Sequence, residues 1–225
     1  NLANVNTTGY KRDRAVFEDL LYQRLVQAGG QTSANTSAPT GMMLGTGTKV
    51  VATEKMHAQG NMVMTQNALD VAVSGDGFFQ ILQPDGTVAY TRDGSFKLSP
   101  TGQLSTSGGA LLQPTIQVPN NAESITIGAD GVVSAKIFGT AQQQVLGNLQ
   151  LARFINPAGL ESIGQNLLRA NAASGPVQQL KPGTNGAGQL VQGALEASNV
   201  NVVEEMVNMI ETQRAYEIKI GRAHV

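Results

Sequence analysis

The chain has 225 residues, enough for one large or two modest domains with a buried core. Its 15 Lys and Arg residues nearly balance 16 Asp and Glu residues, so no basic surface is available to hold phosphates and nucleic acid is not expected as a partner. The chain has no cysteine, which excludes disulfides and thiolate metal sites, and no stretch approaches the ~18 apolar residues of a membrane span.

The first residues, NLANVNTTGYK, contain the tripeptide Asn-Val-Asn at Asn4–Asn6, and the same tripeptide recurs at Asn199–Asn201. Asn is suited both to ending a helix in the left-handed conformation and to capping the start of one. We therefore expect the first copy to end a helix that precedes Asn1, and the second copy to begin a C-terminal helix. The two ends of the chain would then return to one place and pair.

Residues 9–25, GYKRDRAVFEDLLYQRL, have the apolar spacing of a short amphipathic helix, although a partly irregular segment fits them equally well. The following VQAGGQTSANTSAPTGMMLGTGTKV is rich in Gly, Ser, Thr and Asn and has few large apolar groups. Such a segment cannot bury enough surface to fold alone. It is expected to be a linker, or an extended arm that is ordered by a neighbour.

The middle of the chain alternates short apolar runs with turn signals, about every 8–9 residues at first, as in sandwiches, barrels and curled sheets. Asp-Gly suits the positive φ of hairpin turns. The signals are Asp76-Gly77, Asp85-Gly86, Asp93-Gly94, Thr101-Gly102, Gly108-Gly109 and Asp130-Gly131. The pattern predicts a mainly β fold with a terminal α-helix (α+β), built on a central antiparallel β domain.

After Ser198 the apolar period changes to the 4-3 spacing of a helical heptad seam. Ser198 or Asn199 is the expected N-cap. The predicted coiled-coil interface consists of Val202, Val203, Met206, Met209, Ile210, Gln213 and Tyr216. A lone helix of about 20 residues is marginal in water, so the seam needs a second helix, supplied by the missing N-terminus or by another subunit.

The last six residues, Ile220–Val225, depart from this seam and match one reading frame of a common sequencing adapter. We expect the natural chain to differ after Lys219. His224 would then have no role.

Signals for catalysis or metal binding are weak. His57 is the one credible histidine, and the chain has no G-x-S-x-G nucleophile motif. The Gly-rich 41–49 segment lacks the spacing of a phosphate-binding loop. Asp76 and Asp93 could act as the acid and base of a cell-wall enzyme, or belong to a carbohydrate-binding module, but turn chemistry explains them. No enzyme activity, cofactor, metal or small-molecule substrate is expected.

Four motifs, in order, resemble signatures of the bacterial flagellar rod and hook proteins. They are NLANVNTTGYKRDRAVFEDLLYQ, LDVAVSGDGFFQI, YTRDGSFKLSPTGQL and QGALEASNVNVVEEMVNMIETQRAYEI, and together they cover most of the chain. The resemblance implies a junction formed by Asn4, Val5, Asn6, Gly9, Tyr10, Asn199 and Asn201. It also implies a stiffening arm that includes Gln23, Gln27, Gln31, Pro39 and Gly41.

The resemblance further implies a structural subunit that self-assembles helically into the hollow drive shaft of the flagellar basal body. The arm favours the straight distal section of this rod; the proximal rod or the hook is the alternative. Neighbouring axial proteins and the ring bushing would be partners, without membrane insertion. The location would be the basal body, from periplasm to outer membrane, after flagellar type III export.

The expected organisation has four parts. Residues 1–68 hold the junction motif, the short helix and the arm, and residues 69–196 form the β domain. Residues 197–219 begin the coiled-coil helix, and residues 220–225 are the adapter-derived tail.

Overall fold

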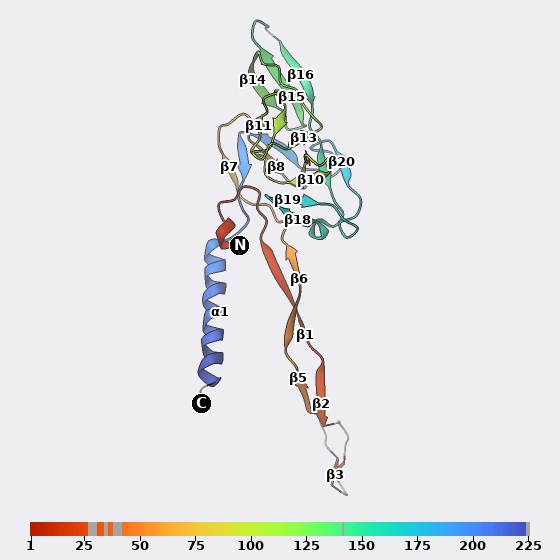
Figure 1. Ribbon diagram of the computed structural model, residues 1–225, viewed down its shortest axis with the longest axis vertical. Coiled ribbons are helices and arrows are strands. Elements are labelled where there is room, and N and C mark those ends of the chain that lie inside the picture. The colour runs from red at the N-terminus through yellow and green to blue at the C-terminus, as the bar shows by residue number, and fades with distance from the viewer. Residues whose placement is uncertain (27–30, 34–35, 38–41, 141, 224–225) are drawn as a thin grey trace. The chain divides into compact units, whose positions relative to one another are not determined.

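The computed structural model describes residues 1–26, 31–33, 36–37, 42–140 and 142–223 (Figure 1). The chain divides by its internal contacts into two units, Asn1–Arg12 with His57–Val225, and Asp13–Met56. The predicted mainly β fold with a terminal helix is confirmed. All strand pairs are antiparallel, and α1 (Val202–Ala223) is the one α-helix among the described residues.

The larger unit is built around a seven-stranded sheet in the order β11-β12-β13-β9-β10-β19-β18. Its strands are β9 (Phe79–Leu82), β10 (Val88–Thr91), β11 (Lys97–Leu98), β12 (Leu104–Ser105), β13 (Leu111–Gln113), β18 (Glu161–Gly164) and β19 (Leu167–Arg169). A three-stranded sheet lies in sequence between β13 and β18 of the larger sheet, with β14 (Ala122–Ile127), β15 (Val132–Ile137) and β16 (Gln143–Asn148).

Three strand pairs complete this unit and bring distant parts of the chain together. They are β8 (Val71–Ser74) with β21 (Gln189–Gln192), β7 (Met62–Met64) with β22 (Ala194–Glu196), and β17 (Leu151–Arg153) with β20 (Gln178–Leu180). Short 3-10 helices lie at η1 (Leu2–Asn4) and η2 (Pro157–Gly159). The β7–β22 pair places the strand before α1 beside a segment more than a hundred residues earlier in the chain.

Four of the six turn signals lie in loops that join paired strands, namely Asp85-Gly86, Thr101-Gly102, Gly108-Gly109 and Asp130-Gly131. The second residue of each of these pairs is a glycine with the expected positive φ, between 79° and 88°. The other two signals do not close hairpins. A Cβ at Gly94 would lie 1.7 Å from the Val71 carbonyl oxygen, so glycine is required there by a close backbone approach.

The core of the larger unit is closed. Phe79, Ile81 and Leu112 are at most 1% exposed and belong to one apolar cluster. A second cluster contains Phe78, Tyr90 and Phe154, whose rings meet edge to face. Burial of each large side chain stabilises the fold by roughly 1.5–3 kcal/mol. The larger unit therefore has a hydrophobic core of its own.

The smaller unit is a two-stranded antiparallel ribbon. The prediction of a short helix within residues 9–25 is therefore wrong. β1 (Asp13–Asp19) pairs with β6 (Thr48–Lys55), and β2 (Tyr22–Val26) pairs with β5 (Met42–Gly45). The short strands β3 (Gln31–Ser33) and β4 (Thr36–Ser37) also pair. The β-branched residues of the partner TKVVATEK favour a strand, and pairing with that partner overrides the weak helical spacing.

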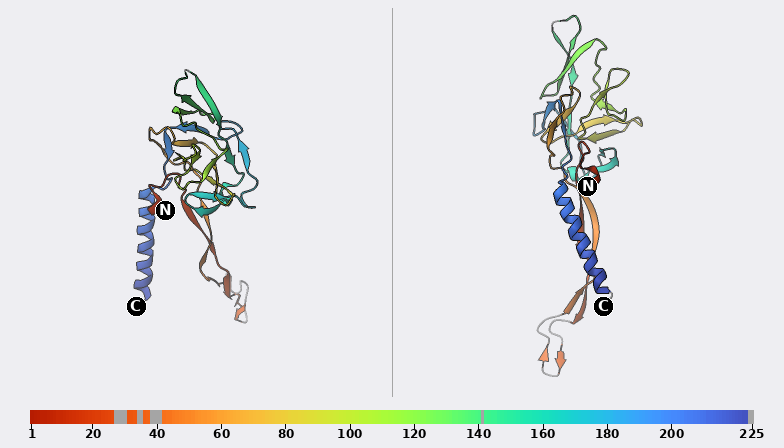
Figure 2. Two further views of the ribbon diagram at one scale, coloured as in Figure 1. Left: turned by 45° about the horizontal axis from the view of Figure 1, so that its top comes forward. Right: turned by 90° about the vertical axis from the view of Figure 1, so that its left-hand side faces the viewer.

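α1 continues past Lys219, the expected boundary, to Ala223. It leaves the β domain as a single helix, and the chain's N-terminus lies beside its first turn in both views of Figure 2. No helix in the described part of the chain is both long and apolar enough to cross a membrane.

Candidate functional site: the junction and the exposed surfaces

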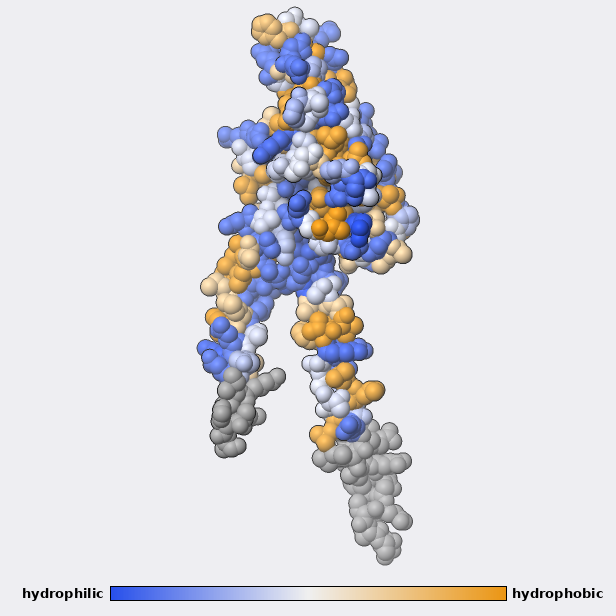
Figure 3. All heavy atoms as spheres, in the orientation of Figure 1, coloured by the Kyte–Doolittle hydropathy of each residue, from blue (hydrophilic) through white to orange (hydrophobic). Residues whose placement is uncertain are grey.

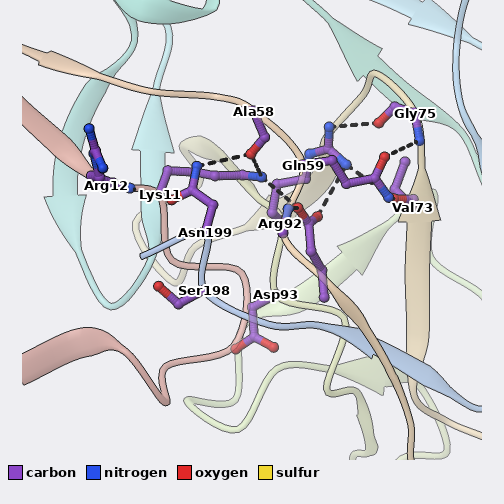
Figure 4. Close-up of polar contacts among 12 residues, drawn as sticks. Lys11, Arg12, Ala58, Gln59, Val73, Gly75, Arg92, Asp93, Ser198 and Asn199 are labelled. Carbon is purple, nitrogen blue, oxygen red and sulfur yellow. Dashed lines mark hydrogen bonds and ion pairs between the residues drawn. The ribbon is translucent and has the colours of Figure 1, made fainter. Parts of the chain in front are cut away.

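A buried charge cluster of Lys11, Arg92 and Glu196 ties the N-terminal segment to the end of β22, the strand that precedes α1. The Lys11 Nζ lies 2.5 Å from one Glu196 carboxylate oxygen, and the Arg92 guanidinium lies 3.3 Å from the other. None of the three side chains is more than 5% exposed. A buried ion pair is stable only when further hydrogen bonds satisfy its groups, and Figure 4 shows how backbone groups surround this one.

Those further bonds come from backbone atoms of neighbouring loops and of β8. Lys11 also donates to the Ala58 carbonyl at 2.9 Å, and the Gly60 N–H donates to Glu196 at 2.8 Å. The Arg92 guanidinium donates to the carbonyls of Val73 and Gly75 (Figure 4). Glu196 thus joins the N-terminal segment, the loop before β7 and the sheet at one point.

Burial lowers the pKa of the Lys11 ammonium, and the charge of Glu196 partly offsets this effect. Burial likewise lowers the pKa of Arg92, again against the influence of Glu196. Both cations lose hydration when the chain folds. Removal of the Glu196 carboxylate, the one anion of the cluster, would therefore leave the positive charges of Lys11 and Arg92 buried without it.

Gly9 holds the N-terminal segment close to the domain. Its φ is +67°, and a Cβ on it would lie 2.6 Å from the Asp93 backbone nitrogen. The Gly9 N–H donates to the Glu196 carbonyl at 2.7 Å, and Asn166 donates to the Thr8 carbonyl. Glycine is needed here because both the positive φ and the close backbone approach exclude a larger residue.

The second Asn-Val-Asn copy has two different roles. The Asn199 side chain accepts from the Arg12 N–H at 2.7 Å and donates to the Ala58 carbonyl at 2.9 Å, so it bridges two segments. Asn201 caps α1, because its side-chain oxygen accepts from the N–H groups of Val203 and Glu204. The expected cap at Ser198 or Asn199 is wrong; the Ser198 hydroxyl instead accepts from the Val200 N–H.

The first copy lies at the end of η1. The Asn4 carbonyl accepts from the Thr7 N–H at 3.2 Å, and its side chain accepts from the Thr7 hydroxyl. The Val5 N–H donates to the Leu2 carbonyl, and Asn6 follows in the same turn. The Tyr10 carbonyl accepts from the Asn199 N–H at 3.4 Å. The structure thus brings Tyr10 and Asn199 together, whereas Asn4 lies in a local turn.

The first turn of α1 carries a second, more exposed set of contacts. Arg12 lies 2.7 Å from the Glu204 carboxylate and 3.8 Å from the Glu205 carboxylate. Asn1 donates a hydrogen bond to Glu205 at 3.0 Å. Acidic side chains at this position also interact favourably with the positive end of the helix dipole.

All seven predicted interface residues of α1 are exposed, and apolar side chains are visible along the face of the helix that Figure 3 shows. Val203 is 71% exposed, Met206 49% and Tyr216 66%. Val207 and Ile218 were not predicted, yet both are exposed. They lie four residues before and seven residues after Glu211, and therefore on the helix face of Glu211 and not on the heptad seam, because successive helix residues are about 100° apart.

The predicted arm residues fall largely outside the described residues. Gln27, Pro39 and Gly41 are not described, and of Gln31 only the backbone of β3 is described. Gln23 is exposed and pairs with Leu44 between β2 and β5.

The ribbon itself exposes large apolar side chains that the sequence analysis did not single out. Phe17 is 65% exposed, Val50 58% and Leu21 87%. Ion pairs join directly opposite residues of β1 and β6, as in Asp13 with Lys55 at 2.9 Å. Further pairs of this kind are Arg14–Glu54 and Glu18–Lys49. Cross-strand pairs of this kind fix the register while leaving the apolar groups uncovered.

The aspartates of the Asp-Gly pairs lie in loops between strands, among them Asp76 and Asp93, the two candidates for catalysis. Asp93 accepts from the Ser95 N–H and hydroxyl, and Asp85 accepts from those of Thr87. These bonds from Thr87 lower the pKa of Asp85, which is the opposite of what a general acid needs. His57 packs against the Phe78 ring with centroids 5.6 Å apart. Among the described residues there is no cluster of three potential metal ligands.

A β domain with a closed core that carries an exposed apolar helix and an exposed apolar ribbon has the build of an assembly subunit. Two family models match the chain. "Flagellar hook protein FlgE/F/G D1 domain" matches residues 72–135, and "Flagellar basal body rod FlgEFG protein C-terminal" matches residues 191–220.

Individual relatives extend the match over nearly the whole chain. "Flagellar basal-body rod protein FlgG" of Buchnera aphidicola subsp. Acyrthosiphon pisum is 53% identical over 97% of this chain and 84% of its own length. The FlgG proteins of Borreliella burgdorferi and Bacillus subtilis are 51% and 38% identical, over 97% and 96% of this chain and 83% of each relative. The chain belongs to the flagellar hook and basal-body rod family.

Proposed function

We propose that this chain is a structural subunit of the bacterial flagellar basal-body rod, and that it forms the distal rod by helical self-assembly. The chain acts by packing against copies of itself and against neighbouring axial proteins, and it has no catalytic role. It works in the basal body, after export through the flagellar type III apparatus. Partners above, below and around it would be the proximal rod, the hook and the ring bushing.

The observation that carries this proposal is the exposed apolar surface of α1. Val203, Met206 and Ile210 are each at least 46% exposed on a helix of 22 residues. Each such side chain would contribute roughly 1.5–3 kcal/mol if it were fully buried. A helix of this length gains most of its stability from packing, so a second helix must cover this face.

The ribbon supports assembly independently. A two-stranded sheet is marginally stable in water by itself, and this ribbon exposes Phe17, Leu21 and Val50. Neighbouring subunits that cover these side chains would order the ribbon and cross-link the polymer. Such cross-links would stiffen the shaft, as expected of the arm.

Similarity favours the distal rod over other axial positions. The chain is 53% identical to the FlgG protein of Buchnera aphidicola subsp. Acyrthosiphon pisum and 35% identical to "Flagellar basal-body rod protein FlgF" of Caulobacter vibrioides. Deletion of residues 23–41 tests the assignment. Curved or compliant rods are expected, whereas straight rods of normal stiffness would contradict the role of the arm.

A matched pair of lysine substitutions tests the assembly role of α1. Met206→Lys places a charge in the apolar surface, and Glu211→Lys places one on the opposite face of the same helix. In a strain that lacks its own distal rod protein, Met206→Lys should abolish rod formation and swimming, and Glu211→Lys should support both. Electron microscopy of basal bodies measures the result. Normal rods with Met206→Lys would overturn the proposal.

A further inference from the structure

The chain is buried in the β domain up to the start of α1, and the helix that follows is largely exposed. Val200 is 7% exposed and is the last buried residue before the helix, which begins at Val202. From Asn201 onward, Glu205 is the one half-buried residue among those whose burial is described, and the others are exposed, from 39% at Val202 to 71% at Val203 among the large apolar ones. The direction of the helix is therefore set by few contacts. Arg12 and Asn1 reach its first turn, and Leu2 and Ala3 lie beside the next turns.

Arg12 is well placed to supply those contacts. Its neighbour Lys11 is held in the buried charge cluster, and the Arg12 backbone N–H is bound by Asn199 at 2.7 Å. The Arg12 backbone is thus fixed relative to the β domain. Its side chain is 22% exposed and reaches the carboxylates of Glu204 and Glu205, on successive residues of the first turn.

We propose that Arg12 is an electrostatic latch that fixes the direction of α1, and that release of its contacts with Glu204 and Glu205 lets the helix pivot at Asn201. The buried charge cluster and the domain core would stay intact in the released state. The inference concerns how α1 is attached, and it does not depend on what α1 binds.

The chemistry of the contacts favours a releasable latch. A guanidinium presents several donors in a planar fork and can engage two carboxylates at once. The pair with Glu204 is partly exposed, with the Glu204 side chain 49% exposed, so salt screens it. The pairs of the buried charge cluster, at most 5% exposed, are screened much less. Salt should therefore free the helix direction before it affects the domain.

Double electron–electron resonance on the 225-residue chain tests this inference. The chain has no cysteine, so Lys97→Cys on β11 and Glu211→Cys on α1 give two unique sites for spin labels, both at exposed residues. Excess unlabelled protein removes distances between molecules. The measured quantity is the width of the distance distribution between helix and domain.

We expect a narrow distribution at low salt and a broad one at 0.5 M NaCl, where the Debye length falls to about 4 Å. The distance distribution of Arg12→Gln should be broad at both salt concentrations. Loss of the exposed ion pairs should raise the ratio of released to latched helix by up to about five-fold. Arg12→Lys should resemble the parent at low salt. Arg14→Gln, which breaks a similarly exposed pair within the ribbon, should leave the distribution unchanged.

Two results would overturn the inference. One is an Arg12→Gln distribution as narrow as that of the parent; the other is a parent distribution that is already broad at low salt. Glu204→Gln provides a second variant that leaves the Arg12 segment untouched, and it should broaden the distribution in the same direction. Thermal unfolding of the β domain should be the same in all these variants, since none of them alters the core.

Discussion

Phe79 and Phe17 are the same side chain in opposite settings. Phe79 is fully buried in the β domain, next to Phe96 at a ring distance of 5.0 Å, whereas Phe17 is 65% exposed on the ribbon. Val73 in the core and Val203 on α1 differ in the same way, at 0% and 71% exposure. The domain completes its packing within the chain, and the helix and the ribbon do not. Apolar side chains therefore stabilise the fold in one region and prepare contacts in the others.

The largest expected effect on stability is the difference between alanine substitutions at the two phenylalanines. Phe79→Ala should lower the free energy of unfolding by about 3–5 kcal/mol, because it leaves a cavity in a closed core. Phe17→Ala should change it by less than about 0.5 kcal/mol, because the ring contributes little in the free chain. Denaturant unfolding followed by circular dichroism measures both. A comparable loss in Phe17→Ala would mean that the ribbon is packed.

Glu196 and Glu54 extend the comparison to charged residues. Glu196→Gln should cost about 3–5 kcal/mol, because Lys11 and Arg92 would remain buried without their anion. Glu54→Gln breaks the exposed pair with Arg14 and should cost at most about 1 kcal/mol. The same unfolding experiment measures both variants. Equal small effects would show that water reaches the buried cluster.

The pH dependence of stability sharpens the same contrast. Because burial lowers the Lys11 pKa, the unfolded chain binds this proton more tightly than the folded chain does. Stability should therefore rise with pH from the lowered pKa of Lys11 up to about 10.5, its ordinary value. Lys11→Met should lack this component of the rise, and Lys49→Met, on the exposed ribbon, should keep it. Unfolding free energies measured across this range decide the question.

Local patterns predicted much of the β domain and of the helix surface. Turn residues determine hairpins through the backbone conformation of two or three neighbouring positions. The residues of the heptad seam all belong to one continuous segment of the chain. Both signals are read without knowledge of distant partners. The turn pairs Asp85-Gly86 and Asp130-Gly131 and the apolar face of α1 were accessible for this reason.

The ribbon and the buried charge cluster depend on distant partners. β1 is a strand because β6 lies beside it, and Lys11 is buried because Glu196, 185 positions later, is its partner. No local signal indicated Glu196. In β22 Ala194 and Glu196 are buried and Leu195 between them is only partly buried, whereas strand alternation read from the sequence would turn the large apolar Leu195 inward and Glu196 outward.

The smallest predicted effect concerns the boundary between the two regions, at Asn201. Asn201→Ala removes the side-chain oxygen that accepts from the Val203 and Glu204 N–H groups, and should destabilise the first turn of α1 by about 1 kcal/mol. Amide hydrogen exchange at Val203 should then be about five-fold faster, while exchange in the β domain is unchanged. Asn208→Ala, in the helix interior, should slow exchange slightly because alanine is the better helix former. If Asn201→Ala also speeded exchange in β22, the helix and the domain would have to unfold as one unit, and the separation between them would be lost.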